Sequence, residues 1–400
     1  MVQFSSLVVS APAKVILHGE HSVVYGKVSL AASVDLRTTL TWERLTNDTV
    51  ELCLCDLGFS SSWTTNQIKE VQISPSVDAD AFKIFLGSHE VSEVAYTAAW
   101  AFVYLYRSIY GESLPSGKFV LKSDIPVGAG LGSSASYCTV LATAMLITSG
   151  VFEPAAIARS EALSKECNMQ RDECLRMISQ WAYKAETIIH GKPSGIDNTV
   201  STFGGFLQFQ AGQIENIKRV PEFNIFLINT NVSRSTKTMV AGLRQRYEEM
   251  PKVYDHLFCA ISEISVDCRR ILEQLCGADL VEKTAVLHDS EKDATECFSR
   301  LEKLIDLNQD ILRTLGVSHS VINKVCETTM AYGLHSKLTG AGGGGFVITL
   351  LKQDMMKPEA LDRLSKELKE IGCDCLRTKL GGGGVAIHDW AVNENIKKQS

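Results

Sequence analysis

The amino-acid sequence predicts a two-domain protein of mixed α+β and α/β class. Its 400 residues match the length of about two domains. Hydrophobic residues make up 45% of the chain and charged residues 22%, as in ordinary globular proteins. Short strand-like runs alternate with longer helix-like runs, and the composition changes to mainly long helices after the middle of the chain. We therefore expect domains at residues 1–225 and 226–400.

Charge and hydropathy exclude several classes of protein. A formal net charge of −6 gives no broad positive field for a phosphate backbone, so we expect no nucleic-acid partner. The longest apolar stretches, near Leu141–Thr148 and Phe346–Leu351, are far shorter than the roughly 20 residues that cross a bilayer. The termini match no secretory, retrieval or prenylation pattern. We expect a cytoplasmic protein without a membrane partner.

The 12 cysteines are scattered along the chain and contain no CxxC pair. Zinc sites and secreted disulfide frameworks need closer or denser ligands than this. We therefore expect reduced thiols that are mostly buried.

The first part of the chain predicts two strands joined by a functional turn. Apolar and small residues alternate at Leu7–Ser10 and Val28–Leu40, and the turn between them contains His18-Gly19-Glu20-His21. Residues 41–90 have weak periodicity and carry no prediction. In Val91–Tyr110 apolar residues, Val94 among them, recur every three to four positions, which predicts an amphipathic helix.

The rest of the first half alternates strands and helices. We expect a strand at Lys118–Ser123, a buried helix at Ala135–Ser149 and a long helical region from about Pro154 to His190, ended by Gly191. Two more strands are predicted, at Phe203–Phe209 and Phe223–Asn229.

The second half predicts long helices within Thr236–Gly316, followed by a Gly-rich loop. A strand at Phe346–Leu351, a helix at Pro358–Gly372 and a strand at Val385–His388 complete it. The glycine runs 342–345 and 381–384 each adjoin a predicted strand, which indicates ordered loops rather than low complexity.

The most informative motif is S-D-I-P-V-G-A-G-L-G-S-S, from Ser123 to Ser134. Its three alternate glycines let the backbone approach a ligand, and the helix that follows points N–H groups and a positive dipole end at it. The motif is neither a Walker A loop nor a full G-x-G-x-x-G fingerprint. The order of strand, glycine loop and helix favours phosphate binding.

Phosphoryl transfer also needs a metal ligand, a cation and a group that positions the nucleophile. Glu186, on a helix among apolar residues, is a candidate Mg²⁺ ligand or a solvated helix residue. Asp197, in a Gly- and Pro-bounded loop, is a candidate catalytic carboxylate or a turn residue. Lys14, in an apolar run, is either an edge-strand residue or a charge placed in a site.

Two further elements are less specific. His18, Glu20 and His21 could suggest zinc, but no third ligand of suitable spacing is evident. In Ser336–Phe346, five glycines precede a strand, which is more than a simple chain reversal requires.

Pro12–Gly26, Pro126–Ser134 and Lys337–Gly345 together resemble the three motifs of the GHMP kinases, a family that phosphorylates small alcohols. Their order, spacing and flanks match over nearly the whole chain, and the strongest likeness is to the animal members that act on mevalonate. The resemblance implies an N-terminal domain like domain 2 of ribosomal protein S5 and a ferredoxin-like C-terminal domain.

The resemblance implies a site for ATP and Mg²⁺. Ser134 and Glu186 would bind Mg²⁺. The residues that would contact ATP are Lys14, Ser123, Gly128, Ala129, Gly130, Leu131, Gly132, Ser133 and Ser134.

It also implies phosphorylation of the primary 5-hydroxyl of (R)-mevalonate, giving 5-phosphomevalonate and ADP on the route to isoprenoids and sterols. Asp197 would accept the hydroxyl proton, and Lys14 would lower the pKa of that hydroxyl and neutralise charge. Arg234 would pair with the substrate carboxylate. The residues that would line the substrate site with Asp197 are Glu20, His21, Ser194, Arg234, Thr236, Gly340 and Ala341.

The family further implies a homodimer and inhibition by farnesyl or geranyl diphosphate. A kinase for another alcohol is an alternative, but Val15–Val23 departs from the galactokinase signature. A silent metabolite-binding regulator is a second alternative, which the joint presence of Lys14, Ser134, Glu186 and Asp197 disfavours. Peroxisomal import is less favoured than the cytoplasm.

Overall fold

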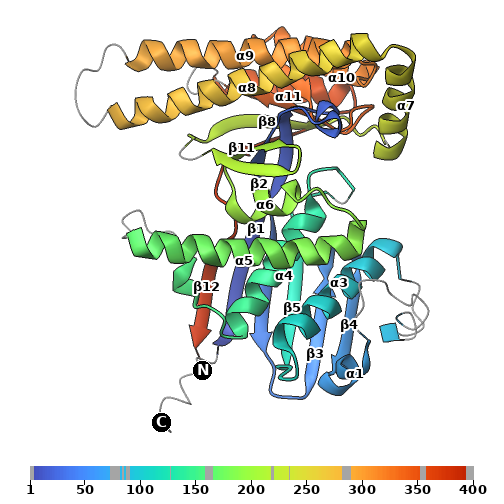
Figure 1. The fold of residues 1–400 in the computed structure, drawn as a ribbon, viewed down its shortest axis with the longest axis vertical. Helices are drawn as coiled ribbons and strands as arrows, with labels where there is room; N and C mark the ends of the chain where they lie inside the picture. Colours follow the sequence, from blue (N-terminus) through green and yellow to red (C-terminus); the bar gives the residue numbers. More distant parts are fainter. Residues whose placement is uncertain are drawn as a thin grey trace. The chain divides into compact units, whose positions relative to one another are not determined.

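A computed structural model describes residues 4–72, 82, 85–86, 91–126, 128–157, 165–217, 220–233, 235–281, 290–351 and 357–392. The chain divides into two compact units (Figure 1). Unit 1 comprises Met1–Ala13, Leu36–Gly204 and Gly383–Ser400, and unit 2 comprises Lys14–Asp35 and Gly205–Gly382. Neither coincides with the contiguous ranges 1–225 and 226–400, because the first two strands contribute residues to both units and the last strand returns to unit 1.

The sheet of unit 1 is mostly antiparallel. The first residues of β1 (Phe4–His18) pair with β12 (Ala386–Val392), and the end of β2 (Ser29–Arg44) pairs with β5 (Gly117–Ser123). Strand β3 (Thr49–Leu54) runs parallel to β5 and antiparallel to β4 (Phe59–Thr64). The short helix α1 (Thr65–Glu70) follows β4 and begins with a capping box at Thr64.

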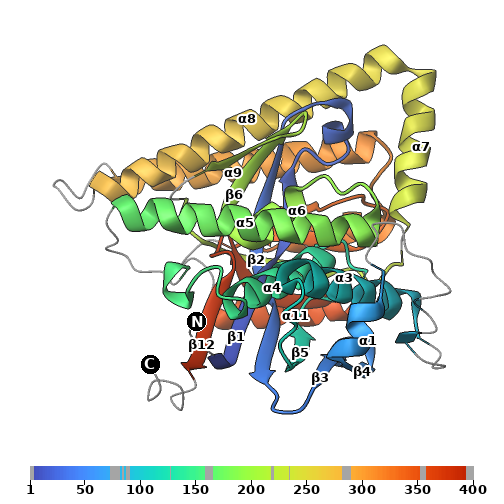
Figure 2. The ribbon, with the colours of Figure 1, turned by 60° about the horizontal axis from the view of Figure 1, so that its bottom comes forward.

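Four helices pack with this sheet. They are α3 (Glu93–Tyr110), α4 (Ser133–Thr148), α5 (Lys165–His190) and α6 (Ile196–Phe203). Helix α4 is apolar on every side, and its residues from Ala135 to Ile147 are all buried, as expected for a helix enclosed by others. It contacts α3, α5 and α6, and it lies beside α5 in both views (Figure 1 and Figure 2). Because α4 is enclosed in the core almost from its first residue, packing fixes the position of its N-terminus.

In unit 2, β8 (Phe223–Asn229) lies between β10 (Phe346–Leu350) and β11 (Asp374–Leu380). Strand β9 (Ser336–Leu338) pairs with β10, and β6 (Phe206–Gln210) pairs with β2 and with β7 (Gln213–Ile217). The helices are α7 (Thr236–Glu249), α8 (Pro251–Val281), α9 (Ser290–Thr314), α10 (Ser320–Met330) and α11 (Pro358–Glu370). Apolar residues of β8 and β10 pack against α8, α10 and α11 to form this core.

Most predicted elements are confirmed. Helix α6 was not predicted, and Phe203, expected in a strand, is instead its last residue. Val94, expected in the buried stripe of α3, is 49% exposed. The helix predicted from Pro154 begins, among the described residues, with a short 3₁₀ turn at Pro154–Ala156, whereas α5 starts at Lys165. No helix of the described ranges is both long enough and apolar enough to cross a membrane.

Two glycines of the run 381–384, one in each unit, lie where a side chain would meet other atoms. In unit 2, a Cβ on Gly381 would lie 2.2 Å from Phe206 Cε2. In unit 1, a Cβ on Gly384 would lie 2.1 Å from the Thr202 carbonyl oxygen. At Gly384 the contact is with backbone, so a side chain has no room, and at Gly381 a φ of 85° adds to the contact with the Phe206 ring.

Candidate active site

The glycine loop between β5 and α4 has the backbone geometry that its sequence predicts. Gly128, Gly130 and Gly132 have φ angles of 72°, 75° and 75°, a region that residues with a Cβ rarely adopt. Gly132 is the N-cap residue of α4, and having no side chain it leaves the first N–H groups of the helix without a side-chain cap. These groups and the helix dipole form an arrangement suited to phosphate.

Three polar side chains meet at the first turn of α4. Ser134 Oγ lies 3.0 Å from Glu186 Oε1 and 2.9 Å from His190 Nε2. Glu186 and His190 are four residues apart on α5, so both face α4. Glu186 is only 2% exposed. Its carboxylate and the Ser134 hydroxyl are the hard oxygen donors that Mg²⁺ prefers, so the donor set fits this ion.

A pocket lies beside the glycine loop within unit 1. Its cavity volume is about 120 Å³, it opens to solvent, and Ser133 and Ser134 are in its wall. The wall is mainly apolar, which suits a flat aromatic group. Its apolar residues are Leu54, Leu57, Val94, Ala98, Leu121, Ile125, Tyr137 and Ile189.

Polar groups are placed at one side of this pocket. The Ser123 N–H donates to Asp56 Oδ2 at 2.6 Å, and Ser123 Oγ lies 2.9 Å from Thr38 Oγ1. Thr38 Oγ1 is also 2.7 Å from Ser136 Oγ on α4. This chain of hydrogen bonds ties the end of β5 to the helix that follows the loop.

Asp197 lies in the first turn of α6, where the helix dipole stabilises a carboxylate. The helix starts after Gly195, whose φ is 80°, and Ser194 Oγ accepts a hydrogen bond from the Ile196 N–H at 3.3 Å. Farther along, Ser201 Oγ donates to the Pro12 carbonyl at 3.0 Å. The carboxylate therefore sits on a well-anchored helix rather than on a loose loop.

In unit 2 the first and third predicted motifs are joined directly. Thr339 Oγ1 accepts from the Ile16 N–H at 3.1 Å and donates to the Ile16 carbonyl at 2.9 Å. His21 Nε2 lies 2.9 Å from the Ala341 carbonyl oxygen. His21 has φ 61°, a strained value for a residue with a side chain, and such strain is common at functional sites. Gly340, next to Thr339, is partly exposed.

A buried ion pair lies beneath these two motifs. Lys337 Nζ contacts Glu20 Oε1, and Asn308 Nδ2 donates to Glu20 Oε2 at 3.2 Å. Burial raises the pKa of the Glu20 carboxyl and lowers the pKa of the Lys337 ammonium, while the contact between the two groups opposes both shifts. Neither side chain has exposed surface. In this structure both carboxylate oxygens of Glu20 are therefore engaged by Lys337 and Asn308 and enclosed by protein.

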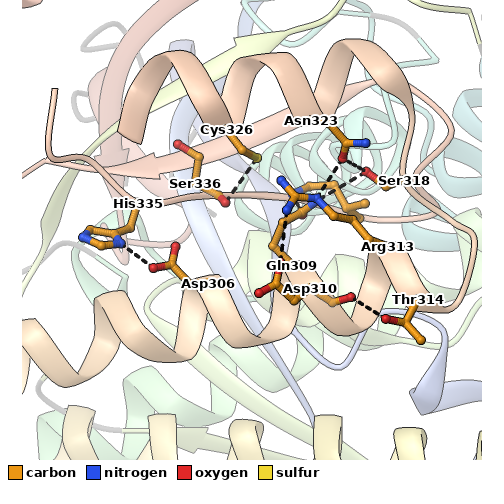
Figure 3. A network of polar contacts seen from close by, with 11 residues as sticks. Asp306, Gln309, Asp310, Arg313, Thr314, Ser318, Asn323, Cys326, His335 and Ser336 are labelled. Carbon is orange, nitrogen blue, oxygen red and sulfur yellow. Dashed lines mark hydrogen bonds and ion pairs between the residues drawn. The ribbon is translucent and has the colours of Figure 1, made fainter. Parts of the chain in front are cut away.

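Side chains of α9 and α10 form hydrogen bonds with strand β9, where the third motif begins (Figure 3). Gln309 Oε1 accepts from the Leu338 N–H at 2.9 Å, and Gln309 Nε2 donates to Ser318 Oγ at 3.2 Å. Cys326 Sγ donates to the Ser336 carbonyl at 3.4 Å. Asn308 and Gln309, adjacent on α9, thus support Glu20 of the first motif and Leu338 of the third.

The remaining predicted residues differ in exposure. Lys14 is 8% exposed, which favours a charge placed inside the protein over an edge-strand residue. Thr236 is exposed and begins α7 after the N-cap residue Ser235. Arg234 lies outside the described residues.

The structure gives no support for zinc at the first motif. His18 Nδ1 is buried without a hydrogen-bond partner, and burial lowers the pKa of this imidazole well below its usual value. In the part of the chain that the structure describes, no three His, Cys, Asp or Glu side chains converge as a metal cluster.

Comparison with known proteins agrees with this geometry. The family model "GHMP kinases N terminal domain" matches residues 94–205, and "GHMP kinases C terminal" matches residues 290–370. The mevalonate kinase of Bos taurus is 40% identical over 395 residues, covering 96% of this chain and 95% of that protein. The chain belongs to the GHMP kinase family. The resemblance inferred from the three motifs is thereby confirmed.

Relatives of this GHMP kinase occur in animals and plants. The mevalonate kinase of Homo sapiens is 40% identical and that of Arabidopsis thaliana 34% identical, covering 96% and 94% of this chain and 95% and 98% of those proteins. Among solved structures, the Methanococcus jannaschii mevalonate kinase has a TM-score of 0.65 at 22% identity, covering 94% of this chain and 99% of that one. The structure of L. major mevalonate kinase in complex with R-mevalonate has a TM-score of 0.63 at 19% identity, covering 94% of this chain and 96% of that one. These likenesses confirm the two-domain fold.

Sequence reasoning missed several residues of this GHMP kinase. His190 contacts Ser134. Its position four residues after Glu186 could have indicated that both side chains lie on the same face of the helix. Asp56 and Thr38 at the pocket had no such signal, because their partner Ser123 is far away in sequence. Asn308 likewise meets Glu20 across 288 positions.

Proposed function

We propose that this GHMP kinase transfers the γ-phosphoryl group of ATP to the primary 5-hydroxyl of (R)-mevalonate, forming 5-phosphomevalonate and ADP for isoprenoid and sterol synthesis. The observation that carries the proposal is the glycine loop before α4, with Ser134 and Glu186 at its end, in a chain 40% identical to mevalonate kinases over nearly its full length. Phosphoryl transfer depends on positioning and charge stabilisation, which such a loop supplies.

The proposal places the nucleotide in unit 1. The N–H groups of residues 128–134 and the start of α4 bind the phosphates, and the apolar pocket lined by Leu54, Val94 and Tyr137 takes the base. Ser134 and Glu186 hold Mg²⁺, which offsets phosphate charge when bound. Ser123, at the pocket edge, and Lys14 complete the contacts with ATP.

Two residues act on the reacting groups. Asp197 accepts the proton of the 5-hydroxyl, for which its place in the first turn of a fixed helix provides a defined orientation. Lys14 lowers the pKa of the hydroxyl and neutralises charge on the transferred group. The burial of Lys14 supports this role, because a charge excluded from water acts more strongly.

Mevalonate is held by residues of several elements. Arg234 pairs with the substrate carboxylate. His21, Ser194, Thr236, Gly340 and Ala341 line the site. Glu20 acts indirectly, since its contacts with Lys337 and Asn308 fix the turn that carries His21.

We further propose an assembly, an inhibitor class and a location for this kinase. The protein acts in the cytoplasm as a homodimer, and farnesyl or geranyl diphosphate competes with ATP by occupying the phosphate-binding loop. Equilibrium sedimentation tests the dimer. Saturating farnesyl diphosphate without effect on the rate would overturn the inhibition.

Product identification tests the reaction. Purified protein with Mg·ATP and (R)-mevalonate is expected to yield one monophosphate, with a ³¹P NMR signal coupled to the C5 methylene protons. (S)-Mevalonate serves as the matched control and should give no product. Phosphorylation at the tertiary 3-hydroxyl, or equal use of both enantiomers, would contradict the proposed site.

A further inference from the structure

The donor atoms of Ser134, Glu186 and His190 have the spacing of three vertices of one octahedron. Ser134 Oγ is 3.0 Å from Glu186 Oε1 and 2.9 Å from His190 Nε2, and the last two atoms are 4.0 Å apart. In an octahedron with metal–ligand distances of about 2.1 Å, adjacent vertices are about 3.0 Å apart and opposite vertices about 4.2 Å apart. The carboxylate and the imidazole therefore match opposite vertices, with the hydroxyl adjacent to both.

We propose that His190 is a third protein donor of the cation site formed by Ser134 and Glu186, and that it shifts the preference of this site toward Mn²⁺ and Co²⁺ relative to Mg²⁺. The inference rests on the proposed function for the presence of a divalent cation here. It adds a ligand and a consequence for ion selectivity. A six-coordinate ion held by these three donors would take its other ligands from phosphate oxygens and water.

The backbone holds all three donors in place. Ser134 is the second residue of α4, and Glu186 and His190 lie one turn apart on α5, which packs along α4 (Figure 1). Helix α5 ends at His190, because Gly191 adopts φ 73° and its N–H bonds to the Thr187 carbonyl. The His190 side chain is 52% exposed, so its ring is accessible from solvent.

Donor chemistry predicts the direction of the selectivity. Mg²⁺ favours oxygen ligands and loses water reluctantly, so an imidazole contributes little to its binding. Nitrogen donors strengthen the binding of first-row transition ions, in the order Mn²⁺ below Co²⁺. Replacing His190 by a residue without a ring nitrogen should thus weaken Mn²⁺ and Co²⁺ binding and leave Mg²⁺ binding nearly unchanged.

Electron paramagnetic resonance of Mn²⁺ tests the inference without turnover. The full chain is titrated with Mn²⁺ in the presence of ADP at pH 8, and electron spin echo modulation is recorded on the bound ion. Three variants are compared with the unmodified protein. They are His190→Gln, Glu186→Gln and, as a matched control, the exposed His256→Gln on α8.

The unmodified protein and His256→Gln should show the modulation of a directly bound imidazole ¹⁴N, and His190→Gln should lose it. The Kd for Mn²⁺ should rise at least about tenfold in His190→Gln, while the Kd for Mg²⁺, measured by competition, rises no more than about threefold. Mn²⁺ that binds in a Glu186-dependent way without ¹⁴N modulation would overturn this inference and leave the proposed function intact. Mn²⁺ binding that ignores Glu186→Gln would overturn the proposed metal site and this inference together.

Discussion

Lys337 and Glu20, 317 positions apart in the chain, form an ion pair in which neither side chain has exposed surface. The pair joins the turn of the first motif to the strand that leads into the third. A buried ion pair gains little stability over apolar residues, but removing one partner leaves an uncompensated charge. The contact therefore links the two motifs inside unit 2.

Removing one charge of this pair is expected to be costly. Lys337→Met should lower the free energy of unfolding by about 3–5 kcal/mol, because the Glu20 carboxylate would remain buried without its partner. The double variant Glu20→Leu/Lys337→Met should be less destabilised than the sum of its single variants. Urea unfolding followed by circular dichroism gives these values.

The matched control for this experiment is Lys379→Met, which removes the exposed ion pair with Glu222 on the same unit. It should leave the unfolding midpoint unchanged. Additive effects in the Glu20/Lys337 cycle would show that the buried pair is not coupled.

Because His18 is buried, we expect the free energy of unfolding to depend on pH. Burial lowers the pKa of its imidazole in the folded protein well below 6.5, so the unfolded chain binds a proton more readily as the pH falls. Stability from this group is complete above about pH 6.5 and is lost as the pH falls below that value. Between pH 7.5 and pH 5.5 the loss should reach about 1 kcal/mol relative to His18→Leu.

Other groups titrate in the same range. The quantity to compare is therefore the difference in free energy of unfolding between the unmodified protein and His18→Leu at each pH. The exposed His256→Gln variant should follow the unmodified protein throughout. If the free energies of unfolding of the unmodified protein and His18→Leu change in parallel with pH, His18 is not held in its neutral form.

Gly342 tests the packing of the third motif. Its φ is 72°, and a Cβ there would lie 2.0 Å from the Val317 carbonyl oxygen, which also accepts the Gly343 N–H. Gly333 has φ 71° but nothing within 4 Å of a Cβ. Gly342→Ala should therefore be about 1–3 kcal/mol less stable than Gly333→Ala, since both share the backbone strain but only one has the clash. Equal thermal midpoints would refute the close packing.

Asp197→Asn separates catalysis from folding. The variant should lose about 10²–10⁴-fold in kcat, because the amide cannot accept the hydroxyl proton, while its melting temperature stays close to that of the unmodified protein. Asp362→Asn, an exposed position on α11, should keep full activity. Turnover within about threefold of normal would show that this carboxylate does not prepare the hydroxyl.

Local patterns predicted most elements and the glycine loop. The three alternate glycines required positive φ, and the apolar run after Ser134 required a buried helix, both of which follow from residues close in sequence. Helix α6 was missed because Gly195 and Pro193 suggest a loop, while its stability comes from packing and from the Ser201 contact with Pro12. Propensity cannot see such a tertiary contact.

The unit boundaries and the buried polar network lay beyond sequence reasoning for the same reason. A strand shared by two units has no compositional signal, and Asn308 and Glu20 are each unremarkable until the fold brings them together. The motif alone singled out Glu20, but it gave no sign that the Glu20 carboxylate is buried in an ion pair with Lys337.

The most direct test of the central claim is ADP release from Mg·ATP by the purified protein, offered mevalonate, phosphomevalonate, homoserine and galactose separately. ADP release is expected with mevalonate alone. Release with one of the other alcohols in place of mevalonate would retain the kinase and contradict the substrate. No release with any of the four, despite measurable ATP binding, would contradict the kinase activity itself and favour a regulator that binds nucleotide without turnover.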